Sequence, residues 1–268
     1  MTPRLPFLPP KADPPFKRKP ERRRVTLIAG FLTRDAIVMA ADSEEVISDY
    51  AKTSTQKIGI INFYGNWLMA IGGAGDAPYI DLFQETLHKR LSLFQKFEFS
   101  KIESVIRATL HEIHKKHIWP RHGDQKAAFQ AIIAIQGLGE SKGRSLLYTC
   151  DSALLKINGL KGFMTIGIGG FLANYVIRRS MSPFGGISNM PTEQVRNLAV
   201  HVLAEVKSRE NGIQNVGGET NVLVIHTNGA MRWMIESEVA EVESWMDAYH
   251  RSQRSVFLAV ASPRVSDS

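Results

Sequence analysis

Residues 26–43 read TLIAGFLTRDAIVMAADS, two apolar runs on either side of the polar turn TRD. This alternation of strand-forming residues with a short turn is typical of a β-hairpin. A second hairpin is predicted for residues 56–62 and 66–75, whose connecting turn carries a Gly-Asn pair. The folded part of the chain is therefore expected to open with four strands in two hairpins.

The segments after these hairpins alternate between helical and extended patterns. After Asp76, a residue type that suits a helix N-cap, apolar side chains recur at helical spacing as far as Phe94. Blocks of strands alternating with pairs of helices predict an α+β fold, a four-layer α-β-β-α sandwich of two antiparallel sheets. Further helices are predicted at 101–118, 171–181, 193–210 and 238–252, and further strands at 127–137, 145–151, 153–159, 162–170, 220–228 and 230–236.

The charge of the chain is concentrated at its N-terminus. Residues 1–24 hold seven of the twelve prolines, eight basic residues and two acidic ones, so they carry six of the seven net positive charges. This composition predicts a disordered, basic tail. The tail could serve as a propeptide or as a partner-binding arm, or it could be an extension without a defined role. We expect one main domain over residues 25–258 and a flexible tail over 259–268. A nucleic-acid surface on the nearly neutral folded part is disfavoured.

Other features of the sequence restrict where the protein acts. Cys150 is the single cysteine, so an intrachain disulfide is excluded, and its apolar surroundings predict a buried, inert thiol. No apolar run reaches the length of about 20 residues that spans a bilayer. These features predict a cytoplasmic protein without a membrane segment. His111, His114 and His117 are spaced by three residues, and a solvated helix face is favoured over a metal site.

Several segments together resemble a known family. Residues 26–43, the QKI at 56–58, AIGGAGDAP at 70–78, GFMTIGIGG at 162–170 and NVLVIHTNG at 221–229 are similar to proteasome core β subunits and their bacterial relatives. That family belongs to the N-terminal nucleophile (Ntn) hydrolases, and the resemblance covers residues 26–237. It implies a threonine-type peptidase or amidase that acts on peptides or proteins and self-associates through helix faces.

The resemblance also implies a set of site residues. Thr26 matches the nucleophile, whose own α-amino group, with an ordinary pKa of about 8, serves as general base. Lys57 matches the lysine that stabilises the developing anion, and Asp42 matches the acid that holds this lysine. Gly72 matches the glycine whose N–H forms the oxyanion hole, and Glu210 stands near a family aspartate at a helix end. This mechanism requires no organic cofactor and no metal.

Two departures from the family pattern leave a second function open. GIGG offers Ile168 where the family commonly has a serine, and Val25 stands where autoprocessed members have a glycine. Thr26 has a free amine only if the chain is cut after Val25, or if translation begins at an internal site that this sequence does not show. The alternative to a hydrolase is therefore a catalytically inactive structural subunit that forms a ring or shell. A third, more remote hypothesis is polyanion binding by the basic tail, and whether an unfoldase acts as a partner is left open.

Overall fold

The computed structural model describes residues 26–48, 51–63, 65–94, 97–121, 129–151, 154–157, 162–208 and 216–261. The N-terminal segment 1–24 and residues 262–268 of the expected C-terminal tail lie outside the described residues. The structure therefore bears on the expected folded domain and leaves the N-terminal tail hypothesis as a prediction.

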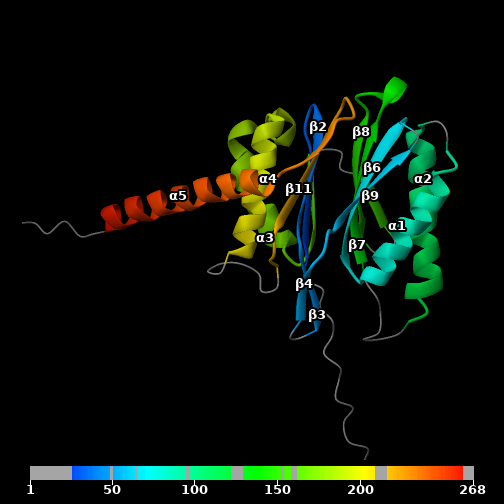
Figure 1. Ribbon diagram of the computed structural model, residues 1–268, viewed down its shortest axis with the longest axis horizontal. Coiled ribbons are helices and arrows are strands. Elements are labelled where there is room, and N and C mark those ends of the chain that lie inside the picture. The colour runs from blue at the N-terminus through cyan, green and yellow to red at the C-terminus, as the bar shows by residue number, and fades with distance from the viewer. Residues whose placement is uncertain are drawn as a thin grey trace, which may run out of the picture.

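Two five-stranded sheets form the centre of the molecule (Figure 1). The β1 sheet has the strand order β10-β1-β2-β11-β12, and the β6 sheet has the order β5-β6-β7-β8-β9. Every neighbouring pair in both sheets is antiparallel. The strands are β1 (Leu27–Leu32), β2 (Ala36–Asp42), β5 (Ile58–Phe63), β6 (Trp67–Gly75), β7 (Phe129–Gly137), β8 (Ser145–Asp151), β9 (Leu154–Ile157), β10 (Phe163–Gly167), β11 (Thr220–His226) and β12 (Met231–Trp233).

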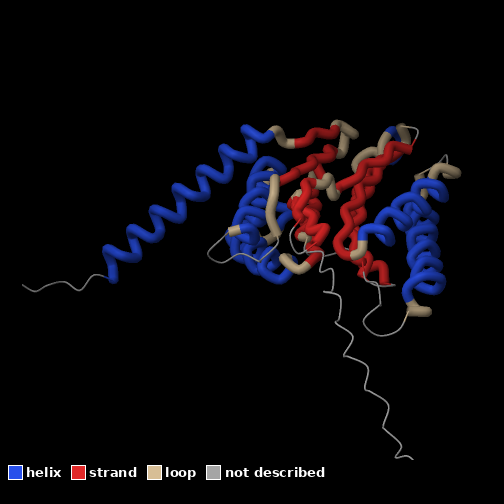
Figure 2. The backbone as a smooth tube through the Cα atoms, turned by 60° about the horizontal axis from the view of Figure 1, so that its bottom comes forward, coloured by secondary structure: helices blue, strands red, loops and turns tan. Residues whose placement is uncertain are grey.

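Helices cover the outer face of each sheet (Figure 2). Helices α1 (Ala77–Leu91) and α2 (Phe99–Ile113) share an apolar core with the β6 sheet. Helices α3 (Gly170–Met181) and α4 (Thr192–Lys207) share another with the β1 sheet, which α5 (Glu236–Ala261) joins through its first turns. Shorter helical turns span His114–Ile118, Gly139–Ser141, Ser182–Phe184 and Ile187–Asn189.

A third apolar cluster contains residues of both sheets. It includes Ile28 and Met39 from the β1 sheet and Leu68 and Ile132 from the β6 sheet, all almost fully buried. Because these strands bury both faces, they read as continuous apolar runs rather than as a strict polar-apolar alternation. The expected mixed fold of antiparallel sheets and helices is confirmed, and both predicted N-terminal hairpins are present.

Two elements differ from the expectation. A small hairpin of β3 (Glu44–Ser48) and β4 (Ala51–Ser54) follows β2 and was missed, because its short, polar strands carry little apolar signal. Helix α5 is longer than the predicted helix 238–252 and runs to Ala261, into the predicted tail. The added residues contain no helix breaker before Pro263, so the helical pattern continues. None of the described helices has the length and hydropathy needed to cross a membrane.

Candidate active site

A buried ion pair lies at the end of β2. Asp42 is fully buried, and its Oδ2 atom lies 2.9 Å from the ammonium nitrogen of Lys57. The Leu27 N–H donates to Asp42 Oδ1 at 2.8 Å, and the Gly217 N–H donates to Oδ2 at 3.4 Å. Lys57 also donates to the carbonyl oxygen of Glu44 at 2.6 Å. Asp42 thus ties the start of β1 to the lysine.

The charges of this pair depend on each other. Burial raises the pKa of Asp42 above its ordinary value, while the Lys57 charge and the Leu27 N–H act in the opposite direction. Burial likewise lowers the pKa of Lys57, and the Asp42 carboxylate opposes that change. Each residue therefore stabilises the charged form of the other inside the protein, where an unpaired charge is costly.

Thr26 and Lys57 line the same cleft. Thr26 immediately precedes β1 and is 6% exposed. The cleft has a volume of about 150 Å³ and lies between the strand ends and α1. It is bordered by Thr26, Glu45, Gln56, Lys57, Gly73, Gly75, Asp81 and Gln84, among others. The structure therefore brings together Thr26, Lys57 and Asp42, which the sequence analysis singled out. Thr26 and Lys57 line the cleft, and Asp42 lies behind Lys57. Their catalytic roles stay predictions.

A glycine holds the backbone of Thr26 in place. Gly167, at the end of β10, pairs with Leu27 and has a φ of +87°. A Cβ atom at this position would lie 1.8 Å from the carbonyl oxygen of Thr26, so only glycine fits. The Gly167 N–H donates to Oε1 of Gln130 on β7 at 3.0 Å. The next residue, Ile168, is half exposed and offers no hydroxyl to the site.

At the glycine-rich end of β6, Gly73 lines the cleft, whereas the expected residue Gly72 does not. Gly72 pairs with Ile58 and Ile132, and a Cβ there would lie 3.0 Å from Ile28 in the core between the sheets. Gly73 has the opposite orientation and lines the cleft with Gly75. The oxyanion role of Gly72 stays a prediction. Glu210 lies outside the described residues.

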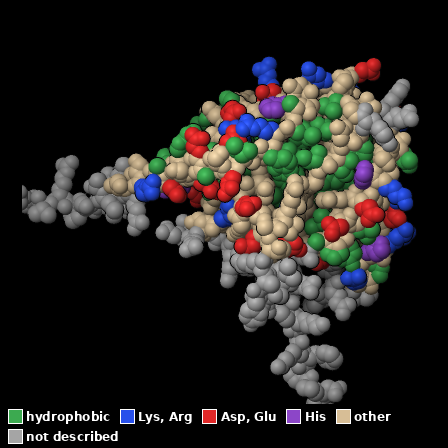
Figure 3. Space-filling view, viewed as in Figure 1, with side chains coloured by type: hydrophobic (Ala, Val, Ile, Leu, Met, Phe, Trp, Pro, Cys, Tyr) green, Lys and Arg blue, Asp and Glu red, His purple; other side chains and the backbone are tan. Residues whose placement is uncertain are grey.

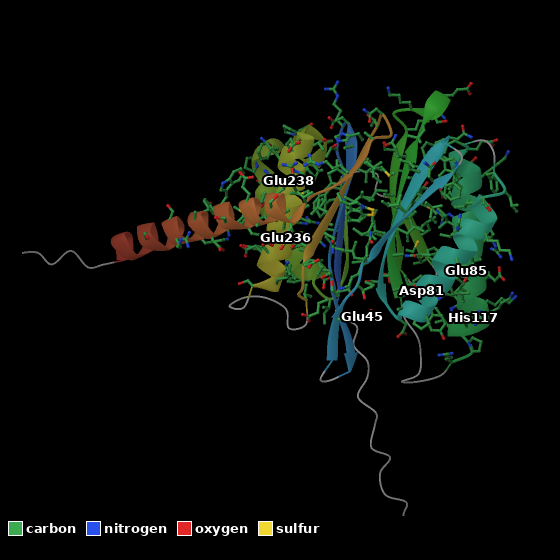
Figure 4. The ribbon with its side chains drawn as sticks, in the orientation of Figure 1. Glu45, Asp81, Glu85, His117, Glu236 and Glu238 are labelled. Atoms are coloured by element: carbon green, nitrogen blue, oxygen red, sulfur yellow. The ribbon has the colours of Figure 1, made fainter. Side chains whose placement is uncertain are left out.

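Acidic side chains at the cleft were missed by the sequence analysis. Glu45 lies on β3, and Asp81 lies on α1, one helical turn before Gln84 on the same face. Figure 4 labels Glu45 beside β3 and Asp81 on α1, and Figure 3 shows acidic side chains on that side of the molecule. Their approach depends on how α1 packs, which no local motif indicates.

Two other sequence interpretations are settled by burial. Cys150 is a buried free thiol, as expected, and burial raises its pKa. The expectation of a solvated histidine face is wrong for His114, which is 2% exposed and stacks on Phe129 with 5.7 Å between ring centroids. His111 and His117 are exposed. His114 is buried because it packs against Phe129 of β7, a contact between separate elements that the spacing of the histidines does not anticipate.

Comparison with solved structures finds similar folds. Anbu (ancestral beta-subunit) from Yersinia bercovieri matches with a TM-score of 0.67 and 12% identity, covering 91% of this chain and 100% of that chain. The Anbu complex from Pseudomonas aeruginosa, solved as a helical assembly, matches with a TM-score of 0.70 and 14% identity at the same coverage. An Anbu (Gly-1) mutant from Hyphomicrobium sp. strain MC1 matches with a TM-score of 0.66 and 14% identity, covering 85% of this chain and 96% of that chain. No protein-family model and no curated protein sequence matches the chain.

These structures correct the expected family. The sequence segments indicated a proteasome core β subunit of the Ntn hydrolases, whereas the similar structures are Anbu proteins, which are proteasome-like but distinct. The prediction of a proteasome core β subunit is wrong. At 12–14% identity the likeness shows the fold, and function must be argued from the site.

Proposed function

We propose that the protein is a threonine-type amide hydrolase of peptides or proteins, with Thr26 as its nucleophile once the chain begins at that residue. The observation that carries the proposal is that Thr26 and Lys57 line one cleft, while buried Asp42 bonds both Lys57 and the backbone N–H of Leu27. Nucleophilic attack on an amide needs a hydroxyl, a base that takes its proton and stabilisation of the developing anion, for which Thr26, its freed α-amino group and the Lys57 cation are the candidates.

The chemistry needs only groups of the chain. The free α-amino group of Thr26 accepts the hydroxyl proton, and the oxygen attacks the scissile carbonyl carbon to give a tetrahedral oxyanion. The intermediate collapses to an ester, and the departing amine takes the proton. Water then attacks the ester, and the α-amino group of Thr26 again serves as the base. This step releases the acid and restores Thr26. The Lys57 ammonium lowers the energy of the anionic states because it is held near the nucleophile in a site of low exposure.

Self-assembly forms the second part of the proposal. The similar structure from Pseudomonas aeruginosa is a helical assembly of the Anbu complex, which supports a homo-oligomer here. The packing of both sheets against helix pairs also supports the predicted four-layer sandwich. The competing function is an inactive structural subunit, favoured by Ile168 and by Val25 before the nucleophile position. Both functions include assembly, so only the terminus and the activity separate them.

The deciding experiment compares the N-terminus with activity. Intact mass and N-terminal sequencing of the protein from its own host show whether the mature chain begins at Thr26. In parallel, hydrolysis of fluorogenic peptides is measured for a chain beginning at Thr26 and for one beginning at Met1. We expect activity only when Thr26 is first. A host protein that keeps residues 2–25, together with an inert Thr26-initiated chain, would establish the structural subunit instead.

The acidic residues of the cleft predict a preference for basic side chains. Asp81 is exposed at the cleft wall, where its carboxylate attracts a substrate arginine or lysine. We expect Asp81→Asn to reduce kcat/KM about threefold for peptides with arginine before the scissile bond, the size of an exposed ion pair. Peptides with leucine there should be unaffected. Glu85→Gln, one turn further along α1 and outside the cleft lining, is the control; equal losses for both peptides would contradict the preference.

A further inference from the structure

Three side chains with metal-binding atoms meet between α4 and α5, on the opposite side of the β1 sheet from the β6 sheet. His201 and Glu205 lie four residues apart on α4, and His250 lies on α5. One ligand atom from each residue lies within 4.8 Å of the other two. His250 Nε2 is 2.6 Å from Glu205 Oε1, and His201 Nδ1 is 3.9 Å from the same oxygen. None of the three residues takes part in the cleft chemistry.

The separations suit a small divalent cation. Zinc binds imidazole nitrogen and carboxylate oxygen at about 2.0–2.2 Å, so tetrahedral ligand atoms lie about 3.3 Å apart. The two separations, 2.6 and 3.9 Å, lie on either side of that value. Residues four apart on a helix face the same way, so His201 and Glu205 form one side of the site and His250 closes it.

A buried nitrogen gives independent support. His201 Nδ1 is shielded from solvent and has no hydrogen-bond partner among the described residues. A buried polar atom of this kind costs free energy unless it is bound. The Glu205 oxygen that lies 3.9 Å from this nitrogen already contacts His250. A cation between the three residues would satisfy the nitrogen and keep the carboxylate paired.

The position of the cluster gives it a structural consequence. Helix α5 is 26 residues long and projects away from the body of the molecule (Figure 1). Its early contacts include the buried residues Val239 and Val242, and His250 lies about two turns beyond them. Among the described side chains, His250 is the last on α5 that contacts a carboxylate of α4. A bound cation would therefore fix the middle of α5 to α4.

We propose that His201, Glu205 and His250 bind one divalent cation of the zinc type and thereby fasten α5 to α4. Two imidazoles and one carboxylate suit Zn²⁺ and its neighbours among the transition metals better than Ca²⁺ or Mg²⁺, which prefer oxygen ligands. Three protein ligands leave a fourth position for water. This site is separate from the hydrolase chemistry at Thr26, which requires no metal.

The test uses the full chain without a histidine tag, stripped of metal and then dialysed against Zn²⁺. Elemental analysis should find one zinc per chain. His201→Ala and His250→Ala should each weaken binding by more than about 100-fold, since even supporting residues of metal sites contribute 10- to 100-fold. Glu205→Gln, which keeps the shape of the side chain, covers the case in which an alanine variant fails to fold. The matched control replaces the exposed histidines His111 and His117 together by alanine and should keep the zinc.

Co²⁺ supplies a second readout. With Co²⁺ bound, the parent chain should show the strong visible absorption of a four-coordinate site. Added Zn²⁺ should displace the Co²⁺ and abolish this absorption. The proposal is overturned if the parent binds no zinc at micromolar concentrations, or if the histidine and Glu205 variants bind as well as the parent. Loss of binding in the His111 and His117 control would also overturn it, because the site would then lie on α2 and the helical turn His114–Ile118.

Discussion

A chain that begins at Thr26 and carries Thr26→Ala is expected to hydrolyse peptides at least about 1000-fold more slowly than the same chain with threonine. Removal of a nucleophile from a covalent mechanism leaves only the rate enhancement that binding and electrostatics provide. The loss should appear in kcat, because the substitution removes two small atoms at the cleft wall and leaves the rest of the lining unchanged. Single-turnover kinetics with a fluorogenic peptide would measure it.

Thr26→Ser is the matched comparison for this result. Serine keeps the hydroxyl and the α-amino group and removes only a methyl group, so measurable activity should remain. Light scattering and circular dichroism should show the same assembly and fold for all three chains. If the alanine chain hydrolyses peptides as fast as the parent, Thr26 is not the nucleophile, and any hydrolase activity belongs elsewhere.

Asp42→Asn is expected to lower the free energy of unfolding by about 3–5 kcal/mol. The substitution keeps an oxygen that can accept the Leu27 N–H, but it removes the charge that balances Lys57. The Lys57 side chain is 8% exposed, so its ammonium group would remain buried without a counter-charge. Urea unfolding at neutral pH, followed by tryptophan fluorescence, would measure the change.

A double-mutant cycle separates this charge effect from simple loss of packing. Lys57→Met removes the cation and keeps an unbranched side chain, so Asp42→Asn combined with Lys57→Met should be less destabilised than the sum of the two single variants. Additive losses would show that the pair contributes no coupling and that its two residues act separately on stability.

The family resemblance, and not strand patterns alone, pointed to Asp42, Lys57 and Gly72. Pairing of β1 with β2 brings Asp42 next to the start of β1, whereas Lys57 precedes β5 of the other sheet and meets Asp42 only because the two sheets stack. Gly72 shows the limit of this reasoning, because a shift of one residue along a strand exchanges the two faces of the sheet. Gly73 rather than Gly72 therefore lines the cleft.

The remaining residues depend on how separate elements pack. Gln130 reaches Gly167 from the other sheet, and Asp81 reaches the cleft through the position of α1. His201 and His250 are far apart in the sequence, and only the crossing of α4 and α5 joins them. The family prediction was wrong because the quoted segments indicate this fold, which the Anbu structures share at 12–14% identity.

The contact between Gly73 and Ile80 divides the site into two parts that can change independently. A Cβ atom on Gly73 would lie 2.3 Å from the Ile80 side chain, so α1 sits directly against the end of β6 and has little room to tilt. In the proposed hydrolase, Thr26, Asp42 and Lys57 lie on or directly beside β1, β2 and β5, whereas Asp81 and Gln84 lie on this anchored helix. Exchange of Asp81 or Gln84 would then change the preference for a substrate side chain and leave the proposed reacting groups as they are.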